Sequence, residues 1–163
     1  MAVLIKGCHA FFWMILACAL LSACSSVGPD TDAPLDAAAK YQLGMQYGVD
    51  DGDRSTPVDY EQARYWLEQS AAEGHLPAMH ALGWMYYEGR GATKDMPRAV
   101  GLFRTAAEQG YAESQYMLGL LYAQGWGVER DNRVSLQWIQ RAAEQGHAAA
   151  KKTLSGFLAP TVE

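Results

Sequence analysis

Two consecutive stretches of equal length decide the fold. Residues 76–111 read LPAMHALGWMYYEGRGATKDMPRAVGLFRTAAEQGY, and residues 112–147 read AESQYMLGLLYAQGWGVERDNRVSLQWIQRAAEQGH. A Leu-Gly pair, an Asp, an Ala-Ala pair and a Glu-Gln-Gly triplet all recur at an offset of 36 residues. The pattern extends upstream to Leu43, with a three-residue insertion at about 49–55, and a partial copy begins at Ala148. Self-similarity at this period is typical of a chain of stacked repeats.

Each copy predicts two helices. In the copy at 76–111, Ala78, Leu82 and Tyr86 share one helical face, and the glycines that follow favour the left-handed turn that ends a helix. A second helix is expected to begin at Asp95, because Asp is a strong N-cap and complements the helix dipole. The equivalent residues in the other copies are Asp59 and Asp131. The chain is therefore predicted to be all-α, with repeats over about 39–75, 76–111 and 112–147 and a partial capping helix over 148–158.

A recurring glycine predicts how the helices pack. Gly83 and Gly119 fall in the middle of a predicted helix, where glycine costs roughly 1 kcal/mol relative to alanine. Its repetition suggests that a neighbouring helix touches the backbone at this point. A single helix pair cannot cover its own apolar face, whereas about three and a half stacked pairs can. The sequence therefore predicts an α-solenoid.

This pattern resembles the Sel-one-like repeat (SLR) family, a relative of the tetratricopeptide repeat. The matching positions in the second copy are Ala78, Leu82-Gly83, Tyr86, Gly89-x-Gly91, Asp95, Ala99, Ala106-Ala107 and Gly110. The third copy matches at nearly every point, with Ser135 replacing Ala and Trp138 present. The resemblance covers about residues 36–158. It implies a right-handed α-solenoid whose concave face binds a protein or peptide.

The first 23 residues are typical of a secretory signal. Lys6 is the only charged residue before Asp30, and residues 10–21 form an apolar run that is shorter than the roughly 20 residues needed to span a bilayer. The alternative is a short membrane anchor that stays attached to the protein. The small residues at the end of the apolar run disfavour this alternative. Residues 21–24, Leu-Ser-Ala-Cys, resemble the lipobox of bacterial lipoproteins. The resemblance implies cleavage before Cys24, attachment of a diacylglycerol to its thiol and, usually, acylation of its new amino group, with fatty acids such as palmitate.

The segment after the lipobox predicts a flexible tether and a membrane-sorting signal. Residues 24–35 are rich in Gly, Pro and short polar residues, which predicts a flexible link to a repeat domain at 36–160. Ser25 resembles the sorting pattern of outer-membrane lipoproteins, which implies a lipid-anchored protein facing the periplasm. The net charge of −5 becomes −6 when Lys6 leaves with the signal. This acidic balance disfavours nucleic-acid binding.

No motif for catalysis, for a metal or for a cofactor is found. The sequence has no His or Cys pair at metal-binding spacing, no Gly-x-Ser-x-Gly elbow and no phosphate-binding glycine loop. An EF-hand register that starts at Asp51 fails, because Thr56 stands where Gly is required and Gln62 where Glu is required. Cysteine-rich SLR relatives have been linked to penicillin binding or β-lactamase activity. They pair cysteines in each repeat, which this chain does not.

The first helix of each copy has a second face that predicts a binding groove. The candidate groove residues are Tyr41, His80, Trp84, Tyr87, Glu88, Tyr116 and Gln124. They are expected to line one trough for roughly nine residues of extended peptide, with His80 and the tyrosine hydroxyls bonding the peptide backbone. His75 and His147 share one repeat position and are predicted to pack between helices. Trp126 is either an exposed loop anchor or a packing residue.

These features favour a non-enzymatic, lipid-anchored adaptor of the cell envelope that holds a protein or peptide partner. The first alternative is an envelope enzyme of the penicillin-binding or β-lactamase kind. The second is a structural subunit of a secretion or polysaccharide-export complex. The sequence indicates neither the partner nor the oligomeric state.

Overall fold

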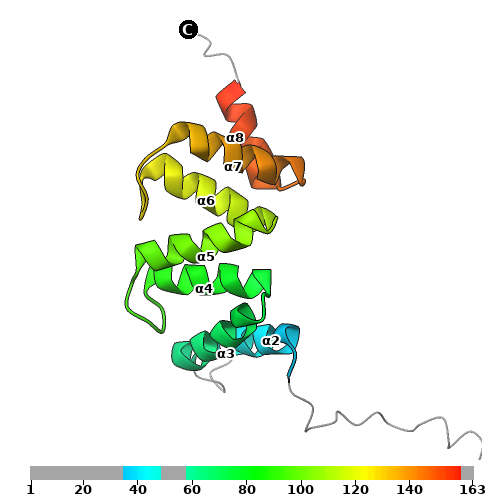
Figure 1. Cartoon of the computed structure of the whole chain (residues 1–163), viewed down its shortest axis with the longest axis vertical. Helices are drawn as coiled ribbons and strands as arrows, with labels where there is room; N and C mark the ends of the chain where they lie inside the picture. Colours follow the sequence, from blue (N-terminus) through cyan, green and yellow to red (C-terminus); the bar gives the residue numbers. More distant parts are fainter. Residues whose placement is uncertain (1–34, 49–57, 159–163) are drawn as a thin grey trace, which may run out of the picture. The chain divides into compact units, whose positions relative to one another are not determined.

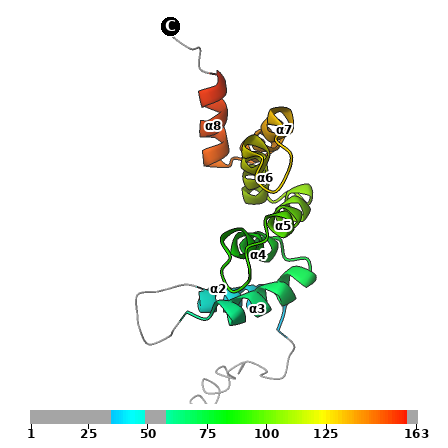
Figure 2. The same ribbon diagram turned by 90° about the vertical axis from the view of Figure 1, so that its left-hand side faces the viewer.

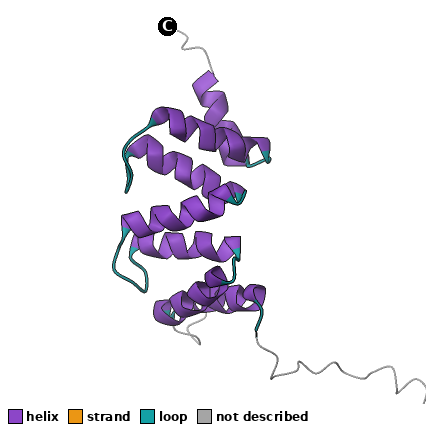
Figure 3. Cartoon of the chain, in the orientation of Figure 1, coloured by secondary structure: helices purple, strands orange, loops and turns teal. Residues whose placement is uncertain are grey.

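The computed structural model describes residues 35–48 and 58–158, and these residues are all-α (Figure 3). Their helices are α2 (Ala37–Gly48), α3 (Tyr60–Ala72), α4 (Leu76–Glu88), α5 (Met96–Glu108), α6 (Ala112–Gln124), α7 (Asn132–Glu144) and α8 (Ala148–Leu158). No strand occurs in this part of the chain, and none of its helices is long and apolar enough to cross a membrane. The predicted signal, Cys24 and the acidic loop at 50–53 lie outside the described residues.

The described helices stack in chain order (Figures 1 and 2). They form the pairs α2/α3, α4/α5 and α6/α7, followed by the single helix α8. Each helix makes its main contacts with the helix before it and the helix after it. This nearest-neighbour packing is that of an all-α solenoid, which the 36-residue period predicted.

The predicted helix boundaries are confirmed by their caps. Asp59, Asp95 and Asp131 are the N-caps of α3, α5 and α7. The Asp131 carboxylate accepts hydrogen bonds from the backbone N–H groups of Val134 (3.0 Å) and Arg133 (2.8 Å). These bonds favour the ionised form and hold the pKa of Asp131 below its usual value.

The mid-helix glycines permit close packing, as their repetition predicted. A Cβ atom at Gly83 would lie 2.8 Å from Cε1 of Phe103, and one at Gly119 would lie 2.6 Å from Cγ1 of Ile139. Phe103 and Ile139 are almost completely buried in the core, on α5 and α7. Each glycine therefore receives a large side chain of the second helix of its own repeat.

A polar network joins the first repeat to the second. Glu68 on α3 accepts two hydrogen bonds from Arg64 (3.0 and 3.1 Å) and one from the hydroxyl of Tyr86 on α4 (2.9 Å). The guanidinium carbon of Arg98 lies 4.1 Å from the centre of the Tyr86 ring. Burial and the bond to Glu68 raise the pKa of Tyr86. This network fixes α3 against α4, and these two helices contribute to the groove described next.

Candidate functional site: a groove between α2 and α4

A groove with a volume of about 260 Å³ lies between α2 and α4, and residues of α3 also line it. Small residues, including Ala63 and Ala81, leave space along it, and Gly44 also lines it. The other lining residues are Tyr41, Met45, Gly48, Tyr60, Leu67, Pro77, His80, Trp84, Met85, Glu88, Arg90 and Tyr111. We call this surface the α2–α4 groove. Its walls are mainly aromatic and apolar, which suits the burial of a partner's side chains.

Four of the seven predicted groove residues line the α2–α4 groove: Tyr41, His80, Trp84 and Glu88. Tyr87 lies beside it, with its ring centre 5.2 Å from that of Trp84. Tyr60 and Tyr111 belong to the groove but were missed, because they stand at the start of α3 and just before α6 rather than on the first helix of a repeat. The prediction from helical spacing used only residues on the first helix of each repeat.

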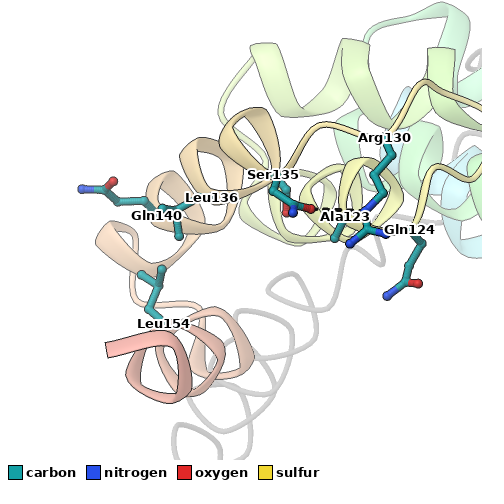
Figure 4. A pocket seen from close by; sticks show the side chains of 8 residues that line it. Ala123, Gln124, Arg130, Ser135, Leu136, Gln140 and Leu154 are labelled. Carbon is teal, nitrogen blue, oxygen red and sulfur yellow. Dashed lines mark hydrogen bonds between the residues drawn. The ribbon is translucent and has the colours of Figure 1, made fainter. Parts of the chain in front are cut away.

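The other two predicted residues lie elsewhere. The Tyr116 ring packs on His147, with ring centres 4.7 Å apart, and its hydroxyl lies 3.3 Å from Oγ1 of Thr153 on α8. Gln124 lines a separate hollow of about 750 Å³ that is formed by residues from α6 to α8, including Leu136 and Leu154 (Figure 4). The seven residues therefore do not share one trough, because Tyr116 contacts His147 and α8 and Gln124 lines the hollow formed from α6 to α8.

A contact between a histidine and a tyrosine recurs at each repeat junction. Tyr41 packs on His75 with ring centres 4.9 Å apart, and Tyr116 packs on His147 in the same way. In the second repeat the two residue types are exchanged, and His80 packs on Tyr111 at 5.5 Å. The prediction that His75 and His147 pack between helices is confirmed.

His80 is held in one tautomer by two hydrogen bonds. The indole N–H of Trp84 donates to Nε2 of His80 (3.1 Å), so Nε2 carries no proton. The proton of the neutral ring is then on Nδ1, which donates to Oγ of Ser114 (2.9 Å). Burial lowers the pKa of His80 from 6.5 to about 4, which keeps the ring neutral near pH 7.

These bonds correct one prediction. His80 was expected to bond a peptide backbone, but both of its ring nitrogens are already used within the protein. Its contribution to the α2–α4 groove is the position of Trp84. The arrangement also disfavours a serine nucleophile, because Ser114 is completely buried and His80 donates a proton to it instead of accepting one. Among the described residues, no group of three or more His, Cys, Asp or Glu side chains could hold a metal ion.

Trp84 and Trp126 each combine an accessible surface with a packing contact. Trp84 lines the groove and also packs on Phe103 of α5, with ring centres 6.0 Å apart, so it contacts both the groove and the second helix of its own repeat. Trp126 is 48% exposed on its loop, and its ring centre lies 6.1 Å from that of Tyr87. Trp126 thus contacts α4, the first helix of the preceding repeat, and about half of its surface remains accessible.

Comparison with known proteins identifies this arrangement. The model of the Sel1 repeat matches residues 37–75, 76–111 and 112–147. No curated protein matches the sequence. A solved Sel1 repeat protein from Oxalobacter formigenes is 32% identical, with a TM-score of 0.66, and the match covers 89% of this chain and 98% of that one.

Two further structures are similar. A protective antigen of uropathogenic Escherichia coli with an SLR fold is 38% identical over 72% of this chain, with a TM-score of 0.67. The match spans only 25% of that longer protein. The Helicobacter pylori cysteine rich protein B is 16% identical, with a TM-score of 0.60 over 72% of this chain and 88% of that one, and shares the fold.

Proposed function

The chain belongs to the Sel1 repeat family, and we propose that it is a lipid-anchored adaptor of the cell envelope that binds a protein or peptide partner in the α2–α4 groove. Sel1 repeat proteins generally mediate protein–protein interaction. The observation that carries the proposal is the groove itself, in which aromatic residues from two repeats meet. Trp and Tyr dominate the binding energy of protein interfaces because they bury a large area at a low entropic cost. We propose that the protein is not an enzyme.

The anchor rests on the sequence of residues 21–24, Leu-Ser-Ala-Cys, behind an apolar run. Two or three acyl chains on Cys24 would hold the protein firmly on a membrane, whereas one chain gives only marginal binding. Ser25, which follows Cys24 as in the sorting pattern of outer-membrane lipoproteins, supports a position on the outer membrane, with the repeat domain in the periplasm. The residues between Cys24 and α2 would allow the groove to bind a partner at some distance from the bilayer surface.

Replacing Cys24 with alanine is expected to abolish labelling by radioactive palmitate. The variant should also fail to mature and should accumulate as the uncleaved precursor. Cys18→Ala is the matched control, because this cysteine would leave with the signal. Palmitate incorporation that persists in Cys24→Ala would contradict the anchor without affecting the groove.

Blocking the groove is expected to remove partner binding. Ala81 lies on its surface, so Ala81→Trp would fill part of the 260 Å³, whereas Ala72→Trp adds the same side chain at an exposed position on α3. Crosslinked complexes from envelope extracts should contain proteins that wild type and Ala72→Trp retain and Ala81→Trp loses. Circular dichroism should show both variants to be fully helical. Equal retention by both variants would contradict the groove as the binding surface.

A further inference from the structure

One end of the α2–α4 groove holds a paired cation. Nε of Arg90 lies 2.8 Å from Oε2 of Glu88, and the guanidinium carbon of Arg90 lies 5.8 Å from the centre of the Tyr60 ring. Arg90 follows α4 in the loop, Glu88 is the last residue of α4, and Tyr60 is the first residue of α3. An arginine of the chain itself thus fills a site made of a carboxylate and an aromatic face, which is the chemistry that binds cations.

The other described residues of the groove carry no charge. Among the lining residues that the structure describes, Glu88 and Arg90 alone have a formal charge, because His80 is neutral near pH 7. The indole N–H of Trp84 is used by His80. The groove therefore offers an apolar, aromatic surface along most of its length and one charged position at its end.

We propose that the partner presents an arginine or lysine that replaces Arg90 at the Glu88–Tyr60 position, with an apolar residue beside it against Met45 and Ala81. This inference rests on the proposed function of the groove. The partner segment is thus basic and apolar, and its positive side chain decides the register in which it binds.

The exchange requires little energy. The side chain of Arg90 is 53% exposed and that of Glu88 is 36% exposed, and ion pairs that are open to solvent contribute little to stability. Arg90 lies in the loop after α4 and can move into solvent, whereas the backbone of Glu88 belongs to α4. A partner that covers the site would shield its own cation from water, which strengthens both the ion pair and the cation–π contact.

An acidic partner is disfavoured for the same reason. A carboxylate that approached Arg90 would meet a guanidinium that is already paired with Glu88, and it would lie close to the Glu88 carboxylate, which repels it. The carboxylate of Glu88 thus distinguishes partners by the sign of their charge, which gives specificity rather than only affinity.

A phage library of random nine-residue peptides, selected on the immobilised full chain in detergent, tests the proposal. Peptides selected on wild type should be enriched in Arg or Lys at one position next to an apolar residue. For a synthetic selected peptide, Glu88→Gln should weaken binding by about fivefold, the equivalent of roughly 1 kcal/mol. Arg90→Ala should strengthen it by roughly threefold or more, because the internal competitor is removed. Glu108→Gln, an exposed change on α5, should leave the affinity unchanged.

The outcomes separate this inference from the proposed function. Selected peptides that lack a basic residue, or that bind Glu88→Gln as well as wild type, would overturn the cation site. If Ala81→Trp still removed their binding, the groove would remain the binding surface. Enrichment of acidic residues, or weaker binding to Arg90→Ala, would assign recognition to Arg90 and overturn the proposal. A failure to select any peptide would count against the cation site and against peptide binding by the groove.

Discussion

Replacing Gly119 with alanine is expected to destabilise the repeat domain by roughly 2–3 kcal/mol, the upper part of the range of about 1–3 kcal/mol found for overpacked cores. The new Cβ atom would lie 2.6 Å from Cγ1 of Ile139 and 3.0 Å from the backbone oxygen of Ser135. Ile139 is almost completely buried and cannot move aside freely, and the carbonyl of Ser135 belongs to α7. Relief of the contact therefore requires α6 and α7 to separate. Urea unfolding followed by far-ultraviolet circular dichroism measures this change.

Gly101→Ala is the matched control, because Gly101 also lies within a helix, α5, but a Cβ atom there would meet nothing within 4 Å. Alanine at this position should stabilise the protein by up to about 1 kcal/mol through helix propensity alone. The same substitution is thus expected to have opposite signs at the two glycines. If Gly119→Ala were as stable as wild type, the helices would not approach as closely as described.

Acidification from pH 7.5 to pH 4 is expected to lower the free energy of unfolding by about 3 kcal/mol through His80 alone. Burial lowers the pKa of His80 from 6.5 to about 4 in the folded protein. Between these two values the unfolded chain binds a proton that the folded protein does not bind. Stability is therefore fully present above pH 6.5 and is lost as the pH falls toward 4. Protonation of Nε2 would also place two donors, His80 and Trp84, against each other.

His80→Gln should flatten this part of the pH profile, because glutamine does not titrate. The control is His75→Gln, which removes another histidine that packs on a tyrosine and does not contribute to the lowered pKa of His80. Thermal melts at half-unit pH intervals from 7.5 to 4 would measure both slopes. A profile of His80→Gln as steep as that of wild type would show that other groups cause the acid sensitivity.

Most of the fold could be predicted from the sequence, because the repeat presents every local signal three times. The Asp residues that cap α3, α5 and α7, and the glycines that receive Phe103 and Ile139, each recur at a fixed spacing. Recurrence identifies a position as structural even where a single copy would be ambiguous. The assignment of His75 and His147 to helix packing follows from the same comparison of copies.

The candidate site was only partly predictable. Helical spacing placed Tyr41, His80, Trp84 and Glu88 on a common side of the first helices, and these four residues share the groove. Spacing gives directions around one helix axis but not contacts between helices. It therefore did not reveal that Trp84 and Ser114 satisfy both nitrogens of His80, or that Tyr60 and Arg90 complete the groove.

Site-specific photocrosslinking in cells tests most directly whether the α2–α4 groove is the binding surface. A photoreactive amino acid would replace Met45, which lines the groove, or Tyr65, which is 51% exposed on α3 and lies outside the groove. We expect a discrete adduct from position 45 that disappears when Ala81→Trp is added, and no such adduct from position 65. Adducts that form equally at both positions, or only at position 65, would contradict the groove as the binding surface.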